Sequence, residues 1–209
     1  LLMLIGVAIF LRGHGNVRQI GRILIGIALI FVSLDMIRAA TGPLVGDPGT
    51  QTVMAYLGRD LVTAFVLGAG FAWIVHSSVA AVLLFVTLAA QAVLPTSAAA
   101  AMILGANLGG AFIAYVLTLT TTVEPRRMVV ANLVLRGGGA ILFTMVIFIA
   151  PDTLEALGAT PARQTINLHL AFNFALAIVM LPLVGPVMAV LTRIMTEKPT
   201  EDARLEDTS

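Results

Sequence analysis

The stretch that decides the fold is WIVHSSVA, residues 73–80, a short polar interruption inside a long apolar run. Its three consecutive hydrogen-bonding side chains are His76, Ser77 and Ser78. As one helix, the apolar run at residues 61–94 would be about 50 Å long, against a hydrocarbon core of about 30 Å. The run is nevertheless too short for two full crossings and a turn. We therefore predict a re-entrant hairpin of two half-length helices that meet at the polar triplet.

The composition indicates an integral membrane protein. Hydrophobic residues make up 59% of the chain and charged residues only 11%, and the mean hydropathy is +1.02, far from the values of soluble domains. The chain has no cysteine, which excludes disulfide scaffolds, thiolate metal sites and cysteine nucleophiles.

Apolar runs predict crossings at about residues 20–40, 128–149 and 165–191. The run at 1–11 is too short to span, and we interpret it as the end of a helix, so we expect the chain to be the C-terminal half of a longer protein. We expect a transmembrane domain over 1–194, an exposed loop over 41–60, and a disordered polar tail over 195–209.

The sequence GANLGG, residues 105–110, interrupts the apolar run that follows the hairpin. Glycine in a helix interior costs about 0.5–1 kcal/mol relative to alanine. With Asn107 among three glycines, we predict a broken transmembrane helix. The alternative is that these glycines only allow close helix packing.

Charge placement supports the hairpin. Loops rich in arginine tend to remain cytoplasmic, and residues 12–22 and 124–127 are such loops. If both are inside, the segment 61–94 must enter the membrane and return to the side it came from. A re-entrant backbone is tolerated only where it is buried in protein or lines water.

Three further residues are candidates for a polar site. Arg136 lies within a predicted crossing, where an arginine usually faces the bundle interior, a partner or an aqueous cavity, although it could also extend toward the interface. His169 and Asn173 share one face of the last crossing, because they are four residues apart.

These features together resemble the sodium/phosphate cotransporter family. That family has two inverted repeats, each with a hairpin carrying Gln-Ser-Ser-Ser and a following broken helix carrying Gly-Ala-Asn-Ile-Gly-Thr-Thr. Here HSSV at residues 76–79 and GANLGGA at 105–111 stand at similar places, and NLHLAFN at 167–173 is similar to a later family pattern. The resemblance covers about residues 20–190 and implies an all-α polytopic membrane protein, one half of an inverted-repeat transporter.

The resemblance implies sodium-coupled phosphate symport, with sodium as the coupling ion and no other cofactor. The implied substrate and ion site consists of His76, Ser77, Ser78, Gly105, Asn107 and Gly109, with sodium at Ser77, Ser78 and Asn107. His76, Val79, Gly110 and Ala111 differ from the family motifs, and the last three replace hydroxyl oxygens that could bind a hard cation. His76 could instead attract an anion or relay a proton.

The chain contains one copy of each motif, so we expect either a missing upstream repeat half or a second copy of the chain to complete the carrier. Its other expected partners are inorganic phosphate, sodium and the lipid bilayer of the cell membrane, and no nucleic acid. Two alternatives remain open: a non-transporting membrane sensor or interaction protein, and a proton-coupled carrier of another anion. An enzyme is not expected, because no HExxH, GxSxG or P-loop pattern occurs.

Overall fold

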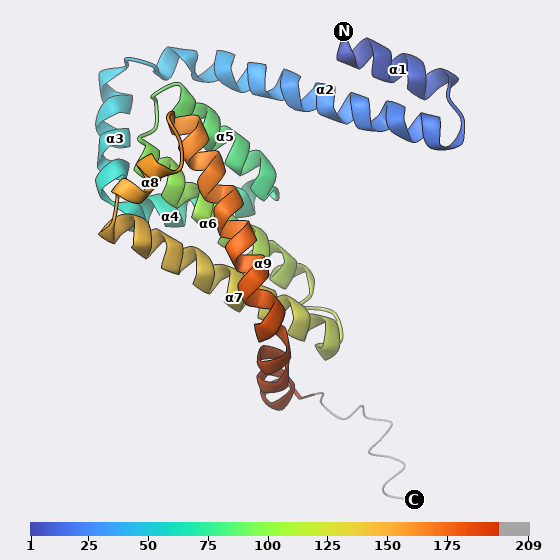
Figure 1. Cartoon of the computed structure of the whole chain (residues 1–209), viewed down its shortest axis with the longest axis vertical. Helices are drawn as coiled ribbons and strands as arrows, with labels where there is room; N and C mark the ends of the chain where they lie inside the picture. The colour runs from blue at the N-terminus through green and yellow to red at the C-terminus, as the bar shows by residue number, and fades with distance from the viewer. Residues whose placement is uncertain (197–209) are drawn as a thin grey trace, which may run out of the picture.

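The structure is a computed structural model that describes residues 1–196, so the predicted tail lies outside the described residues from residue 197 onward. The described part is built from α-helices with short connections (Figure 1). The helices are α1 (Leu2–Arg12), α2 (Gly15–Thr41), α3 (Pro48–Arg59), α4 (Leu61–Val75), α5 (Ser78–Ala90), α6 (Thr96–Leu117), α7 (Val123–Ile149), α8 (Asp152–Ala156) and α9 (Pro161–Ile194), with a 3-10 turn, η1, at Gly42–Leu44.

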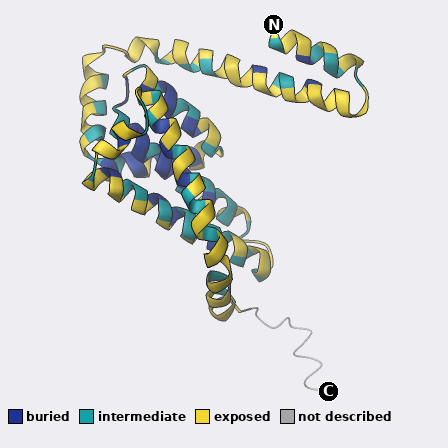
Figure 2. Cartoon of the chain, viewed as in Figure 1, coloured by how far each residue is buried: buried dark blue, intermediate teal, exposed yellow. Residues whose placement is uncertain are grey.

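Four helical segments are long and apolar enough to cross a bilayer. They are Gly15–Leu44, Thr96–Leu117, Val123–Ile149 and Pro161–Ile194. Buried residues concentrate in α4, α5 and α6, while α2, α7 and α9 expose many large apolar side chains (Figure 2). Such an exterior suits lipid rather than water. The prediction of an all-α, multi-pass membrane protein is confirmed.

The predicted hairpin is present as the helix pair α4 and α5. His76 ends α4 in the left-handed conformation (φ 56°, ψ 27°), which few non-glycine residues adopt. Ser77 is extended, and its hydroxyl oxygen accepts a hydrogen bond from the backbone N–H of Ala80 at 3.2 Å. The polar triplet therefore supplies both the turn and the N-cap of the second helix.

Both ends of the hairpin lie on one side of the molecule. Asp60 and the first residues of α4 share a crevice with the end of α7, including Phe148. The end of α5 and the start of α6 line another crevice with Pro161, the first residue of α9. At the opposite side, Arg127 near the start of α7 donates from Nε to the carbonyl of Met195, just beyond α9, at 2.9 Å. Arg127 thus lies away from the hairpin ends, in agreement with the charge bias.

The tip of the hairpin reaches only part of the way along α6. Ser78 lies against Gly110, where an added Cβ would be 3.1 Å from the serine side chain. Trp73 packs edge-on against Phe112, with ring centroids 6.2 Å apart. Because α6 continues to Leu117, the hairpin ends before the far end of the crossing, as a re-entrant segment does.

The prediction of a broken helix at residues 105–110 is wrong. Helix α6 runs without interruption from Thr96 to Leu117. Its glycines contact the backbone of α4: a Cβ on Gly105 would lie 2.8 Å from the carbonyl carbon of Phe65, and one on Gly109 would lie 3.0 Å from that of Ala69. Close packing, the alternative reading, accounts for these glycines.

The predicted loop at residues 41–60 also differs from the structure, because it contains helix α3. The carboxylate of Asp47 caps this helix by accepting from the N–H of Thr50 at 2.7 Å, and Pro48 occupies the first turn, where its missing N–H is harmless. Helix α3 meets α4 at an angle of 107°, at Asp60, which caps α4.

Helices α1 and α2 form an arm that extends from the bundle (Figure 1). They pack through glycines, since a Cβ on Gly21 would lie 2.5 Å from the backbone nitrogen of Phe10. Asp35 and Arg38 form an exposed ion pair at 3.3 Å on α2.

Candidate functional site

A polar cluster lies where α6, α7 and α9 meet, and Arg136 of α7 is its centre. Nη2 of Arg136 donates to Oδ1 of Asn107 on α6 at 2.7 Å and to Oδ1 of Asn173 on α9 at 3.0 Å. Asn107 is only 1% exposed, while Arg136 and Asn173 are half-buried. The arginine thus joins three helices through two neutral acceptors.

The chemistry of arginine fixes the orientation of both carboxamides. A guanidinium can only donate hydrogen bonds, so the two Oδ1 atoms must face it and the two NH₂ groups must face elsewhere. Nδ2 of Asn107 donates to the carbonyl of Ile103 at 2.9 Å and lies 3.5 Å from Nδ1 of His169. Nδ2 of Asn173 donates to the carbonyl of His169 at 2.7 Å and lies 3.3–3.4 Å from both of its ring nitrogens.

Within residues 1–196, no carboxylate pairs with the positive charge of Arg136. Among the residues that the structure describes, the ion pair is Arg38 with Asp35 on α2. Both hydrogen bonds of Arg136 use Nη2, which leaves Nη1 and Nε without an acceptor in the described chain. Since no buried side-chain nitrogen there lacks a partner, Nη1 and Nε are accessible. A half-buried cation with free N–H groups is suited to bind an anion.

The predicted hairpin residues lie apart from this cluster or at its margin. His76 is exposed at the tip, and its Nδ1 is 3.0 Å from the carbonyl of Ile74. Ser77 caps α5 and, like Ser33 of α2, lines a cavity of about 270 Å³. Ser78 lies against Gly110, which is one helical turn from Asn107.

Gly105 and Gly109 have a structural rather than a binding geometry, because both face the backbone of α4. The structure therefore brings together Asn107, Arg136, His169 and Asn173, each of which the sequence analysis named as a candidate. The sequence analysis did not predict that Arg136 would connect the other three residues. The sequence analysis did not name Ser33, which lines the same cavity as Ser77. A lone serine in an apolar helix gives no signal by which it could be predicted.

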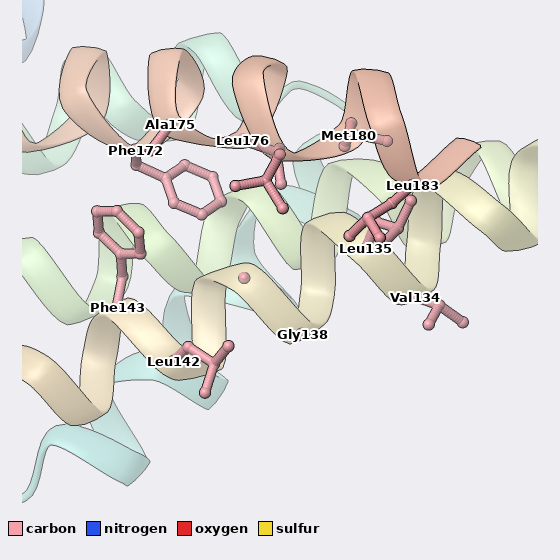
Figure 3. A pocket seen from close by; sticks show the side chains of 12 residues that line it. Val134, Leu135, Gly138, Leu142, Phe143, Phe172, Ala175, Leu176, Met180 and Leu183 are labelled. Atoms are coloured by element: carbon pink, nitrogen blue, oxygen red, sulfur yellow. The ribbon is translucent and has the colours of Figure 1, made fainter. Parts of the chain in front are cut away.

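A separate groove between α7 and α9, of about 290 Å³, is apolar (Figure 3). Its lining includes Leu135, Leu142, Phe143, Phe172 and Leu176. Such a lining offers no donor to an anion, so this groove is not a candidate for an anion site.

The fold and the cluster together define a multi-pass membrane protein with a re-entrant hairpin and a cationic polar site inside the helix bundle. Comparison with known proteins adds relatives. The chain is 32% identical over 206 residues to a protein of Escherichia coli K12 named "Putative inorganic phosphate export protein YjbB". It is 30% identical over 207 residues to the protein of the same name from Salmonella typhimurium.

These alignments cover 98–99% of the chain but 38% of each relative, so the chain spans somewhat over a third of their length. An uncharacterized protein of Bacillus subtilis, YqeW, is 23% identical over 182 residues, which are 87% of this chain and 59% of that protein. No family model matches the chain, and no solved structure matches it. The names of the enterobacterial relatives agree with the phosphate part of the predicted resemblance and mention neither sodium nor symport.

Proposed function

We propose that the protein is a carrier, not an enzyme, and that it moves inorganic phosphate across the cell membrane with Arg136 as the group that binds the anion. The observation that carries this proposal is the guanidinium of Arg136, held by Asn107 and Asn173, with Nη1 and Nε accessible and no carboxylate partner in the described part of the chain. Each of these accessible N–H groups can donate a charge-assisted hydrogen bond to a phosphate oxygen. The name of the enterobacterial relatives supports phosphate as the anion.

Sodium-coupled symport is the finer form of this proposal. The hydroxyls of Ser77 and Ser78 are oxygen ligands of the kind that a hard cation requires. Asn107 is less suited to this role than the sequence suggested, because its Oδ1 already accepts from Arg136 and the neighbouring positive charge repels a cation. Since the chain spans about 38% of its relatives, we propose that other parts of a longer protein, or a second copy, complete the transport path.

The test is radiolabelled phosphate flux in vesicles that contain the complete protein of which this chain is part, measured in both directions, with sodium and with potassium. Arg136→Gln should weaken phosphate binding by about 10- to 100-fold, the equivalent of one charge-assisted pair. Arg136→Lys keeps the charge but not the planar guanidinium, so its phosphate affinity should lie between those of Arg136→Gln and the wild type. Arg38→Gln, at the exposed ion pair, is the control.

Because Arg136 also joins three helices, each variant must first elute as folded protein on gel filtration. Equal phosphate flux in the wild type and in folded Arg136→Gln would refute the site. Absence of flux from folded wild-type protein would favour the sensor or interaction protein. Stimulation of flux by sodium over potassium would support symport, and net outward movement would support export.

A further inference from the structure

The geometry points to His169 as the site where a proton is taken up when an anion binds at Arg136. This inference rests on the proposed function and deepens it, because it assigns a proton that is linked to anion binding to a particular ring. Both residues belong to one cluster, in which the carboxamides of Asn107 and Asn173 stand between the guanidinium and the imidazole.

Without an anion, the cluster favours neutral His169. The two NH₂ groups that face the ring can only donate, so a ring nitrogen must accept, at the 3.3–3.5 Å separations of long hydrogen bonds. A protonated imidazole would oppose donors to donors. It would also place a second positive charge near Arg136, on the other side of the two carboxamides, in a half-buried site.

The groups that face His169 from the surrounding helices leave Arg136 as its charged neighbour. Helices α4 and α5 carry no titratable side chain, and α6 carries only Tyr115, two turns beyond Asn107. Helix α7 contributes Arg136, and its other charged residues lie in its first turns. On α9, the nearest charged residue is Arg163, more than one turn from His169.

A bound phosphate changes which protonation state of the His169 ring is favoured. A dianion at Arg136 changes the local charge from positive to negative, which favours a second cation beside it. The proton comes from water and occupies the lone pair of a ring nitrogen. Anion binding and proton uptake are thereby linked, and linkage is reciprocal.

His76 is the competing histidine, since the sequence analysis considered it for proton relay. It is exposed at the hairpin tip, and its ring contacts the carbonyl of Ile74. Its hydrogen-bond partner is not a member of the Arg136 cluster, so a bound anion at Arg136 would affect it less.

The experiment measures phosphate affinity by isothermal titration calorimetry between pH 5.5 and 8.5, using the complete purified protein and its His169→Gln variant. Glutamine keeps a neutral acceptor for the carboxamides but cannot take up a proton in this range. Phosphate itself titrates in this range, but identically for every variant, so the difference between variants reports the protein. Buffers with different ionisation enthalpies give the number of protons taken up on binding.

As the pH rises, we expect the phosphate affinity of the wild type to fall relative to that of His169→Gln. The slope should be about tenfold per pH unit in the range where one proton is linked to binding. The wild type should take up about one proton more per phosphate than the variant. His14→Gln, in the exposed connection between α1 and α2, should behave as the wild type does.

The outcomes separate the two proposals. Binding by His169→Gln with the wild-type pH profile and proton count would overturn the role of His169 and leave the phosphate site standing. If His76→Gln, rather than His169→Gln, lost the pH dependence of the wild-type affinity, the proton would be assigned to the hairpin tip. That result would equally overturn the role of His169. Absence of phosphate binding by the folded wild type would refute the proposed function and, with it, this coupling.

Discussion

Replacing Gly105 by alanine tests the packing that holds the hairpin against α6. The added Cβ would lie 2.8 Å from the carbonyl carbon of Phe65, closer still to its oxygen, and 3.0 Å from the backbone nitrogen of Ala69. Atoms of the α4 backbone cannot move aside as the end of a flexible side chain can. The two helices would have to separate locally by about 1 Å, in an interior packed as densely as a crystal.

The expected cost of Gly105→Ala is about 3 kcal/mol or more, the upper part of the range for overpacking, because backbone rather than side-chain atoms must move. Helix propensity acts in the opposite direction, since alanine is favoured over glycine by about 0.5–1 kcal/mol in a helix interior. The clash therefore outweighs the gain in propensity.

Gly70→Ala is the control. It lies in α4, and an added Cβ there meets nothing within 4 Å, so it should be neutral or slightly stabilising. The measurement is thermal unfolding of the purified protein in detergent, followed by circular dichroism and gel filtration. If Gly105→Ala unfolded at the temperature of Gly70→Ala and the wild type, the close contact between α4 and α6 would be wrong.

Three further predictions concern caps and helix ends. Ser77→Ala should lower the free energy of unfolding by about 1 kcal/mol through loss of the α5 N-cap. Ser78→Ala leaves the cap intact, so it should lower the free energy of unfolding by less in the same thermal unfolding assay. Arg127→Gln removes a charged donor from the carbonyl of Met195, so hydrogen exchange at the end of α9 should accelerate by about tenfold or more; unchanged exchange there would contradict the contact. The N–H of Thr50 holds the pKa of the Asp47 carboxyl below its usual range, so the cap's contribution is complete above the ordinary pKa and is lost as pH falls through the lowered one. Helicity of α3 should therefore decrease in acid for the wild type and remain constant for Asp47→Asn, as measured by circular dichroism.

The hairpin could be predicted from sequence because two independent constraints agree on it. The apolar run at residues 61–94 has the wrong length for one or two crossings. The arginines at residues 12–22 and 124–127 favour one side for both connections, so the run between them must return to the side from which it enters. Both constraints depend on the bilayer, which is the same for every membrane protein, so no knowledge of neighbouring helices was needed.

The interpretation of residues 105–110 failed because it depended on a neighbour. Propensity alone makes three glycines a weak point in a helix. In the fold, Gly105 and Gly109 face the backbone of α4, and van der Waals packing, which drives helix association in membranes, stabilises the straight helix. Helix α3 was missed for a different reason: Asp47 and Pro48 were read as loop formers, although an N-cap residue followed by proline also begins a helix.

The straight form of α6 has a consequence for the chemistry of the site. A broken helix would offer free backbone N–H and carbonyl groups to ions inside the membrane. An intact helix uses those groups in its own hydrogen bonds, so α6 can contact a ligand only through its side chains. In the polar cluster, α6 contributes the side chain of Asn107, α7 contributes the charge of Arg136, and Asn173 and His169 of α9 complete its surroundings. One face of α6 thus packs its glycines against the hairpin while its asparagine holds Arg136, so the same helix positions both the hairpin and the polar cluster.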